Sequence, residues 1–165
     1  MKSELLNKFR EIKIFLFDLD GVLMHDGESI EKCTDTVSKI CDDFKQLNII
    51  FGIVTARAED KLINKLKTIE NCSVLNGSID KVSMTNKFLL SKAIDYQNVF
   101  YMGDGILDLP LLQKCGLSCA PKSARREVKR AVSLSLSADN CEELLKEILG
   151  YYKKSKESAS RATKY

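Results

Sequence analysis

The sequence has no tryptophan, two prolines and a single histidine, and its six cysteines form no C-x-x-C pair. One histidine and scattered thiols do not assemble an obvious zinc site. No apolar run is long enough to span a bilayer, and charges interrupt the N-terminal segment where a signal peptide would have an apolar core. We therefore expect a cytoplasmic protein with no membrane partner, whose cysteines are reduced and mostly buried.

The bulk composition is that of an ordinary globular chain. Its 165 residues are 44% hydrophobic and 30% charged, which suits one domain with a substantial core. The formal net charge of +3 is too small to indicate a nucleic-acid partner, and it does not repel a small anionic substrate.

Short apolar runs alternate with amphipathic segments along the chain. The apolar runs predict strands at residues 13–17, 49–54, 73–75, 99–102 and 117–120, with a weaker sixth at 131–134. The amphipathic segments predict helices at residues 30–46, 58–70, 81–95, 109–114 and 140–153. This alternation predicts an α/β fold with a three-layer, doubly wound, mostly parallel sheet of five to six strands. We expect one domain over residues 1–152 and a basic, flexible tail over residues 153–165.

Two aspartates end the first predicted strand, in the run Asp18-Leu19-Asp20-Gly21. Residues two apart on a strand share a face, so both carboxylates can reach one phosphoryl group. An exposed aspartate is ionised at neutral pH, so Asp18 could attack phosphorus without an activating base, while Asp20 protonates the leaving alcohol. Two carboxylates beside a phosphate require a cation, and Mg²⁺ suits such a site. The alternative is that these aspartates are plain turn residues.

A threonine and a lysine follow the second and third predicted strands. The Thr55 hydroxyl and the following backbone N–H groups could donate to phosphate oxygens, although a threonine here could equally cap a helix. The Lys81 ammonium could balance the charge of the aspartates and of the phosphoryl group. Lys87, about two helical turns further along, is a competing candidate.

An acidic loop, GDGILD at residues 103–108, follows the fourth predicted strand. Asp104 is placed to ligate the metal, and the flanking glycines let the backbone approach it. Asp108 could cap the next helix, whose first turn contains Pro110, or orient water molecules on the metal without touching it. A loop without any functional role is the alternative.

In chain order these elements are DxDG, T, K and GDxxxD, each just after a strand. The carboxyl ends of parallel strands meet at one edge of a sheet, so the side chains should converge. This order resembles the haloacid dehalogenase (HAD) superfamily over residues 12–149. The resemblance implies Asp18 as nucleophile, Asp20 as acid and base, Thr55 and Lys81 on the phosphate, and Mg²⁺ held by Asp18, Asp104 and the Asp20 main-chain carbonyl.

The intervals between these elements leave no room for a cap domain, since 34 residues separate Asp20 from Thr55 and 25 separate Thr55 from Lys81. Residues 18–23, 76–81, 101–110 and 116–118 resemble the capless 3-deoxy-D-manno-octulosonate 8-phosphate and sialic-acid phosphate phosphatases. That resemblance implies a phosphorylated sugar-acid substrate, a homotetramer, and substrate contacts at Gly21, Ala56, Arg57 and Lys81. The sequence departs from the pattern in a shorter segment after Asp20 and in Ala56 and Gly105, which replace a glycine and an aspartate.

Together these features predict a magnesium-dependent phosphomonoesterase that acts through a phosphoaspartyl intermediate on a small phosphorylated sugar acid. Two alternatives stay open: a capless phosphatase for a macromolecular phosphate, and a non-catalytic binding module on the same fold. The run His25-Asp26-Gly27, just beyond the first motif, could contact the substrate or form a plain exposed turn.

Overall fold

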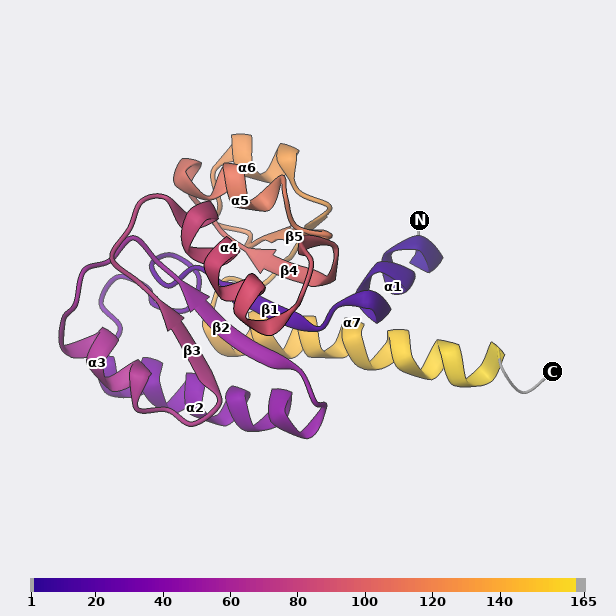
Figure 1. Cartoon of the computed structure of the whole chain (residues 1–165), viewed down its shortest axis with the longest axis horizontal. Coiled ribbons are helices and arrows are strands. Elements are labelled where there is room, and N and C mark those ends of the chain that lie inside the picture. Colours follow the sequence, from indigo (N-terminus) through magenta and orange to yellow (C-terminus); the bar gives the residue numbers. More distant parts are fainter. Residues whose placement is uncertain (1, 163–165) are drawn as a thin grey trace.

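The computed structural model describes residues 2–162, and the side chains of residues 3–158. Its centre is a six-stranded sheet in which all neighbouring strands are parallel, in the order β3-β2-β1-β4-β5-β6 (Figure 1). The strands are β1 (Ile14–Phe17), β2 (Ile50–Val54), β3 (Cys72–Leu75), β4 (Val99–Met102), β5 (Leu117–Ala120) and β6 (Leu134–Ser135). The predicted doubly wound, parallel α/β sheet is confirmed.

Side chains of β1 point alternately to the two faces of the sheet, as the strand period of two requires. Phe15 and Phe17 belong to the core on one face, and Ile14 and Leu16 belong to the core on the other. All four are 0% exposed, so both faces of the strand are covered. Helices α1 (Lys2–Glu11), α2 (Ile30–Gln46), α3 (Lys61–Lys67) and α7 (Cys141–Ala162) cover the Phe15 face, and α4 (Lys81–Lys92), α5 (Leu109–Leu112) and α6 (Arg126–Ala131) cover the other (Figure 1).

A cluster of phenylalanines fixes α2 against the middle of the sheet. Ring centroids lie 5.2 Å apart for Phe15 and Phe44, 4.9 Å for Phe15 and Phe100, and 5.2 Å for Phe17 and Phe51. Burial of each such side chain contributes roughly 1.5–3 kcal/mol, and favourable ring geometry adds to it. The central strands and α2 therefore form a rigid support for the loops at the strands' carboxyl ends.

Acidic caps set the start of the two helices that follow β2 and β3. The Asp60 carboxylate accepts from the Ile63 N–H at 2.8 Å at the start of α3, and the Asp80 carboxylate accepts from the Ser83 N–H at 2.9 Å at the start of α4. A cap of this kind is worth about 1 kcal/mol. The cap at Asp60 explains why α3 begins three residues later than the predicted residue 58.

Two helices were not predicted from the pattern, α1 and α6. The first is amphipathic, and its fully buried Phe9 stacks on Tyr151 of α7 with ring centroids 5.5 Å apart. The second occupies residues 126–131, so the predicted strand at 131–134 is displaced and β6 forms only at Leu134–Ser135. Two short 3₁₀ helices, η1 (Tyr96–Asn98) and η2 (Ile106–Asp108), complete the connections.

Helix α7 extends nine residues beyond the predicted end at Lys153. The residues predicted as a tail are therefore helical as far as Ala162, and the expected domain boundary at residue 152 falls inside the helix. Ser155 is fully buried, and its carbonyl accepts from the Arg10 guanidinium at 3.4 Å, so α1 and α7 pack together. Residues 163–165 of the expected tail lie outside the described residues.

The connections between strands explain where a ligand can reach the sheet. Between β1 and β2 the chain forms a loop and α2, and between β2 and β4 it forms α3, β3 and α4, so neither connection contains a cap domain. Strand β1 lies between β2 and β4, where the strand order reverses, and the crevice at such a point is where doubly wound sheets bind ligands. Asp18 and Asp20 follow β1 at this edge.

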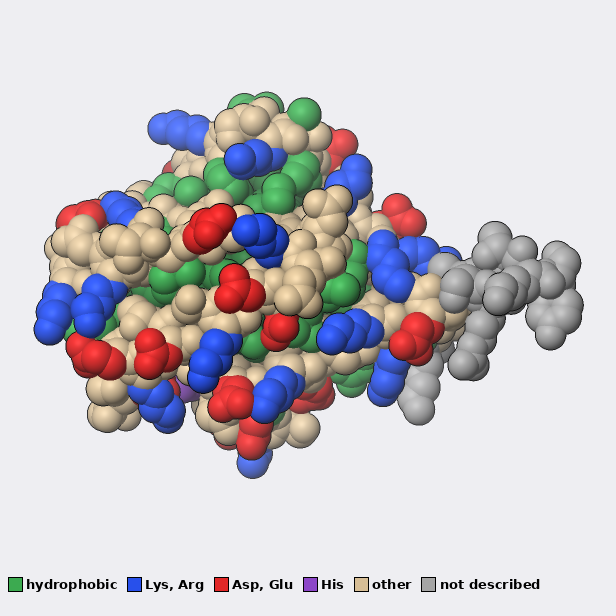
Figure 2. All heavy atoms as spheres, turned by 90° about the horizontal axis from the view of Figure 1, so that it is seen from below, with side chains coloured by type: hydrophobic (Ala, Val, Ile, Leu, Met, Phe, Trp, Pro, Cys, Tyr) green, Lys and Arg blue, Asp and Glu red, His purple; other side chains and the backbone are tan. Residues whose placement is uncertain are grey.

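The surface and the cysteines agree with the composition. Acidic and basic side chains are interspersed on the face shown in Figure 2, as the small net charge leads one to expect. All six cysteines are free thiols and four of them are buried, which confirms that most are buried. No helix within residues 2–162 is both long enough and apolar enough to cross a membrane.

Candidate active site

Asp18 lies at the carboxyl end of β1, and contacts from three other residues fix its backbone and side chain. Its N–H donates to the Met102 carbonyl at 2.8 Å, which continues the pairing of β1 with β4. Its Oδ1 accepts from the Leu19 N–H at 2.8 Å and lies 2.8 Å from Lys81 Nζ. The residue is 7% exposed, so the expectation of an exposed aspartate is wrong. Burial, together with Asp108, raises the pKa of the Asp18 carboxyl to about 7, against the opposing effect of Lys81.

Lys81 is the first residue of α4 and bridges two carboxylates. Its Nζ lies 2.8 Å from Asp18 Oδ1 and 2.6 Å from Asp108 Oδ1, and the residue is 4% exposed. Burial disfavours the ammonium, but Asp18 and Asp108 outweigh that effect and raise the pKa of Lys81 above its ordinary value. Lys87 is exposed to solvent, so of the two candidate lysines the structure brings Lys81 to the aspartates.

Asp108 organises the site through four donors. Its Oδ1 accepts from Lys81 Nζ at 2.6 Å and from the Tyr101 hydroxyl at 2.5 Å. Its Oδ2 accepts from the backbone N–H groups of Asp104 at 3.1 Å and Gly105 at 2.9 Å. The side chain makes no capping bond to α5, so the capping interpretation is wrong. Instead it fixes both the lysine and the loop that carries Asp104.

Tyr101 was missed as a member of the site. It lies within β4, is 0% exposed, and its hydroxyl donates to Asp108. Burial, and then the charge of Asp108, raises the pKa of the Tyr101 hydroxyl well above its ordinary value, so the phenol keeps its proton and acts as a donor. A hydroxyl in an otherwise apolar strand was a usable signal, because a buried phenol usually requires a partner.

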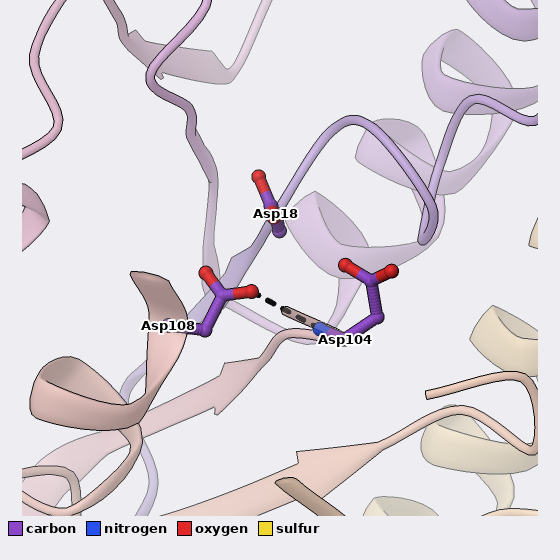
Figure 3. Close-up of side chains that lie close together, drawn as sticks. All are labelled: Asp18, Asp104 and Asp108. Atoms are coloured by element: carbon purple, nitrogen blue, oxygen red, sulfur yellow. Dashed lines mark hydrogen bonds between the residues drawn. The ribbon is translucent and has the colours of Figure 1, made fainter. Parts of the chain in front are cut away.

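Three carboxylates converge where β1 and β4 end. Among the described residues, Asp18, Asp104 and Asp108 each offer an oxygen within 4.8 Å of the other two, and Figure 3 shows the Asp18 side chain, which follows β1, gathered there with those of Asp104 and Asp108 from the residue 103–108 loop. Burial, and then Asp108, raises the pKa of Asp104 above its ordinary value. Crowded carboxylate oxygens of this kind are a donor set that fits a hard divalent cation.

Two glycines permit this close approach. Gly21 has φ +84°, and a Cβ at that position would lie 2.7 Å from the Asp104 Cγ. A Cβ on Gly103 would lie 2.5 Å from the Asp108 Cγ. Real Cβ atoms do not approach other carbons so closely, so side chains here would push Asp104 and Asp108 away. Gly21 therefore shapes the carboxylate cluster and lies on the wall of the adjoining cavity, and its predicted contact with the substrate stays a prediction.

Arg57 connects Asp20 to the start of α3. The Arg57 guanidinium donates to the Asp20 carboxylate through Nη1 and to Asp60 Oδ2 through Nε, at 2.6 Å for the latter. The Asp20 side chain is 55% exposed and is not a member of the carboxylate cluster, but it lines the same cavity as Asp18. Asp60, which was not predicted, therefore both caps α3 and anchors the arginine.

Thr55 ends β2 and is 1% exposed. Its N–H donates to the Leu75 carbonyl at 2.9 Å, and its hydroxyl oxygen accepts from the Arg57 N–H at 3.1 Å. The threonine does not cap α3, because Asp60 does so. Thr55 and Ala56 lie on the wall of the cavity that Asp18 also lines, and their predicted contact with a phosphate stays a prediction.

Two cavities meet at the Asp20–Arg57 pair. One of about 340 Å³ is lined by Asp18, Asp20, Thr55, Ala56, Arg57, Lys81, Gly105, Ile106, Leu107, Asp108 and Arg125. The other, of about 510 Å³, is lined by Asp20, Gly21, Met24, His25, Asp26, Gly27, Glu28, Arg57, Asp104 and Ser123. The predicted site residues therefore lie on two adjoining cavities. A further cavity of about 470 Å³ lies at the opposite ends of β2 and β3 and contains none of them.

The His25-Asp26-Gly27 run forms a turn at the edge of the larger cavity. The His25 carbonyl accepts from the Glu28 N–H at 3.1 Å, Gly27 has φ +79°, and Asp26 and Gly27 are exposed. The run is thus a turn that also borders the site, which is compatible with both interpretations made from the sequence.

Comparisons with known proteins agree with this geometry. The pattern of the haloacid dehalogenase-like hydrolases matches residues 67–148. A 3-deoxy-D-manno-octulosonate 8-phosphate phosphatase of Salmonella typhi is 26% identical over an alignment of 133 residues that covers 75% of this chain and 70% of that protein.

Solved structures have the same fold. A probable YrbI family phosphatase from Pseudomonas syringae pv. phaseolica superposes with a TM-score of 0.78 and 22% identity, over 99% of both chains. The 3-deoxy-D-manno-octulosonate 8-phosphate phosphatase of Moraxella catarrhalis, solved with magnesium, phosphate and KDO, gives a TM-score of 0.74 and 18% identity over 96% of this chain and 98% of that one. By its fold, its motif order and these similarities, the chain belongs to the haloacid dehalogenase superfamily of hydrolases.

Proposed function

We propose that this protein is a magnesium-dependent phosphomonoesterase that acts on a small phosphorylated sugar acid through a phosphoaspartyl intermediate on Asp18. The observation that carries the proposal is the placement of the Asp18 carboxylate, 2.8 Å from the Lys81 ammonium and beside Asp104 and Asp108, on the wall of an open cavity. A carboxylate, a buried cation and further carboxylates for a metal are the groups that phosphoryl transfer requires.

The oxygen donors at the end of β1 fit Mg²⁺, which binds through one or two carboxylates and retains water and phosphate oxygens as its other ligands. We assign the metal to Asp18, Asp104 and the Asp20 main-chain carbonyl. Asp108 has both oxygens engaged by four donors, so its role is to hold Lys81 and the Asp104 loop in place. When bound, the cation would neutralise phosphate charge and favour the ionised form of Asp18.

The side chains divide the chemistry between them. An Asp18 carboxylate oxygen attacks phosphorus, the bond to the leaving oxygen breaks, and Asp20 supplies the proton that this oxygen needs. Asp20 then takes a proton from the water that hydrolyses the acyl phosphate. Lys81 stays beside Asp18 throughout and stabilises charge on the transferring group, and Thr55 and the Ala56 and Arg57 backbone bind phosphate oxygens.

The substrate class rests on similarity together with the shape of the site. The relatives that match over most of their length are named 3-deoxy-D-manno-octulosonate 8-phosphate phosphatases, and the Moraxella catarrhalis structure contains magnesium, phosphate and KDO. The adjoining cavities of about 340 and 510 Å³ would accommodate a sugar phosphate. We therefore propose an eight- or nine-carbon sugar acid carrying a terminal phosphate.

Phosphate release from 3-deoxy-D-manno-octulosonate 8-phosphate, with Mg²⁺ and with a chelator, tests the proposal. Asp18→Asn is expected to lower kcat by at least about 10³-fold while circular dichroism stays unchanged. Lys81→Gln should likewise abolish turnover, and Lys87→Gln, a matched change on the exposed side of the same helix, should not. Wild-type protein that releases no phosphate from this compound or from p-nitrophenyl phosphate would refute the enzymatic function, and an active Asp18→Asn variant would refute the nucleophile.

A further inference from the structure

Three cationic side chains line the smaller cavity, and they differ in whether they already form ion pairs with carboxylates of the protein. Lys81 lies between Asp18 and Asp108, and Arg57 lies between Asp20 and Asp60. Each of these cations is therefore in contact with two carboxylates before any substrate arrives. Arg125 is the third cation on the cavity wall.

Arg125 has no such partner. Among the side chains that the structure describes, no carboxylate lies within ion-pair distance of its guanidinium, and the residue is exposed. Its neighbours on that wall include Ile106 and Leu107, which are 45% and 56% exposed and whose apolar side chains cannot accept its hydrogen bonds. The planar guanidinium is thus available to bind a carboxylate or phosphate through two parallel hydrogen bonds.

The loop that carries Arg125 is fixed at several points. The Arg125 N–H donates to the Asp104 carbonyl at 3.1 Å, which ties the arginine to the loop of a proposed metal ligand. Ala124 is buried, and the Ser123 N–H donates to Asp139 Oδ1 at 2.7 Å. A cation on an anchored backbone loses less freedom on binding than one on a free loop, so it can discriminate between ligands.

We propose that Arg125 is a specificity-determining residue that binds a second anionic group, a carboxylate, on the leaving-group side of the phosphate ester. This inference rests on the proposed phosphatase function and assigns a substrate contact within it. Lys81 and the metal would hold the transferring phosphoryl group, and the uncommitted Arg125 would select substrates that carry a further negative charge. Such a contact is made equally in the ground state and the transition state, so its loss raises KM and leaves kcat nearly unchanged.

A matched pair of probes isolates the effect of the carboxylate. Both 6-phosphogluconate and glucose 6-phosphate have a six-carbon chain and a terminal phosphate, but only the first has a carboxylate. The wild type is expected to favour 6-phosphogluconate in kcat/KM by about 10- to 100-fold, the range for one charge-assisted contact. Arg125→Gln should abolish that preference through KM, and Arg126→Gln, the same change on the next exposed residue, should retain it.

Binding measured by calorimetry in the Asp18→Asn background, with Mg²⁺ present, gives a readout that does not depend on turnover. The same preference, and its loss on adding Arg125→Gln, is expected there. Equal kcat/KM for the two probes in the wild type, a preference that survives Arg125→Gln, or an equal loss for both probes would overturn the assignment. Failure of the wild type to hydrolyse any phosphate ester, with binding selectivity intact, would refute the proposed reaction and leave the Arg125 contact standing.

Discussion

Replacing Asp18 by its amide is expected to make the metal-free protein more stable. The carboxyl group is 7% exposed, and burial and Asp108 raise its pKa from 3.8 to about 7 although Lys81 opposes them. Ionised Asp18 is therefore less favourable in the folded protein than in the unfolded chain, where water solvates it. Asparagine has nearly the same shape and carries no charge, so Asp18→Asn removes the unfavourable ionisation.

The size of the effect follows from the two pKa values. A pKa difference of about three corresponds to about 4 kcal/mol, because each pKa unit is about 1.4 kcal/mol. Since the folded-state pKa is the higher one, the favourable contribution is complete below about pH 4 and is lost as the pH rises through about 7. Relative to the wild type, Asp18→Asn should gain up to about 4 kcal/mol at pH 8 and almost nothing at pH 4.

Urea denaturation in the presence of a chelator, at pH 4, 6 and 8, measures this difference directly. Asp20→Asn is the matched control: the Asp20 side chain is 55% exposed, so its free energy of unfolding should change by less than about 1 kcal/mol at each pH. The reasoning fails if Asp18→Asn is no more stable than the wild type at pH 8, or if its gain does not grow between pH 4 and pH 8.

Two further changes test the surroundings of the site and the packing of the N-terminal helix. Tyr101→Phe removes one of the four donors to the buried Asp108. The variant should have a free energy of unfolding lower by about 1–3 kcal/mol and should release phosphate more slowly. Unchanged stability would show that the hydrogen bond from the Tyr101 hydroxyl to Asp108 contributes nothing. Phe9→Ala removes a fully buried ring that stacks on Tyr151. Urea denaturation should show a free energy of unfolding lower by about 3–5 kcal/mol. A decrease below about 1 kcal/mol would mean that α1 does not pack on α7.

Much of the sheet could be predicted because its strands are buried on both faces. The strands β4 and β5 and helix α2 have the predicted bounds, since continuous apolar runs and a long amphipathic segment leave little choice of structure. Elements whose stability depends on tertiary packing were missed or misplaced. Helix α1 and the end of α7 stabilise each other across a large sequence separation, and no local pattern in residues 153–162 reveals that contact.

The sequence motifs identify residues that converge at the site, but they do not show the hydrogen bonds and ion pairs between them. The motifs placed Asp18, Lys81, Asp104 and Asp108 at one edge, and the structure brings them together. The sequence could not show that Asp18 is buried, because exposure depends on how α4 and the residue 103–108 loop fold over it. Arg125 escaped notice because it belongs to no motif, and only the fold brings the β5–α6 loop to the cavity.

The electrostatics of the cluster connect its stability to its function. The pKa values of Asp18, Asp104 and Tyr101 are all raised, each first by burial and then by the negative charge of Asp108. A fold selected for stability alone would replace such a cluster with apolar side chains, because buried like charges cost free energy. Raised pKa values gathered at the end of β1 are instead what a site built for a cation and a phosphate requires, since a divalent ion there would lower each of these pKa values.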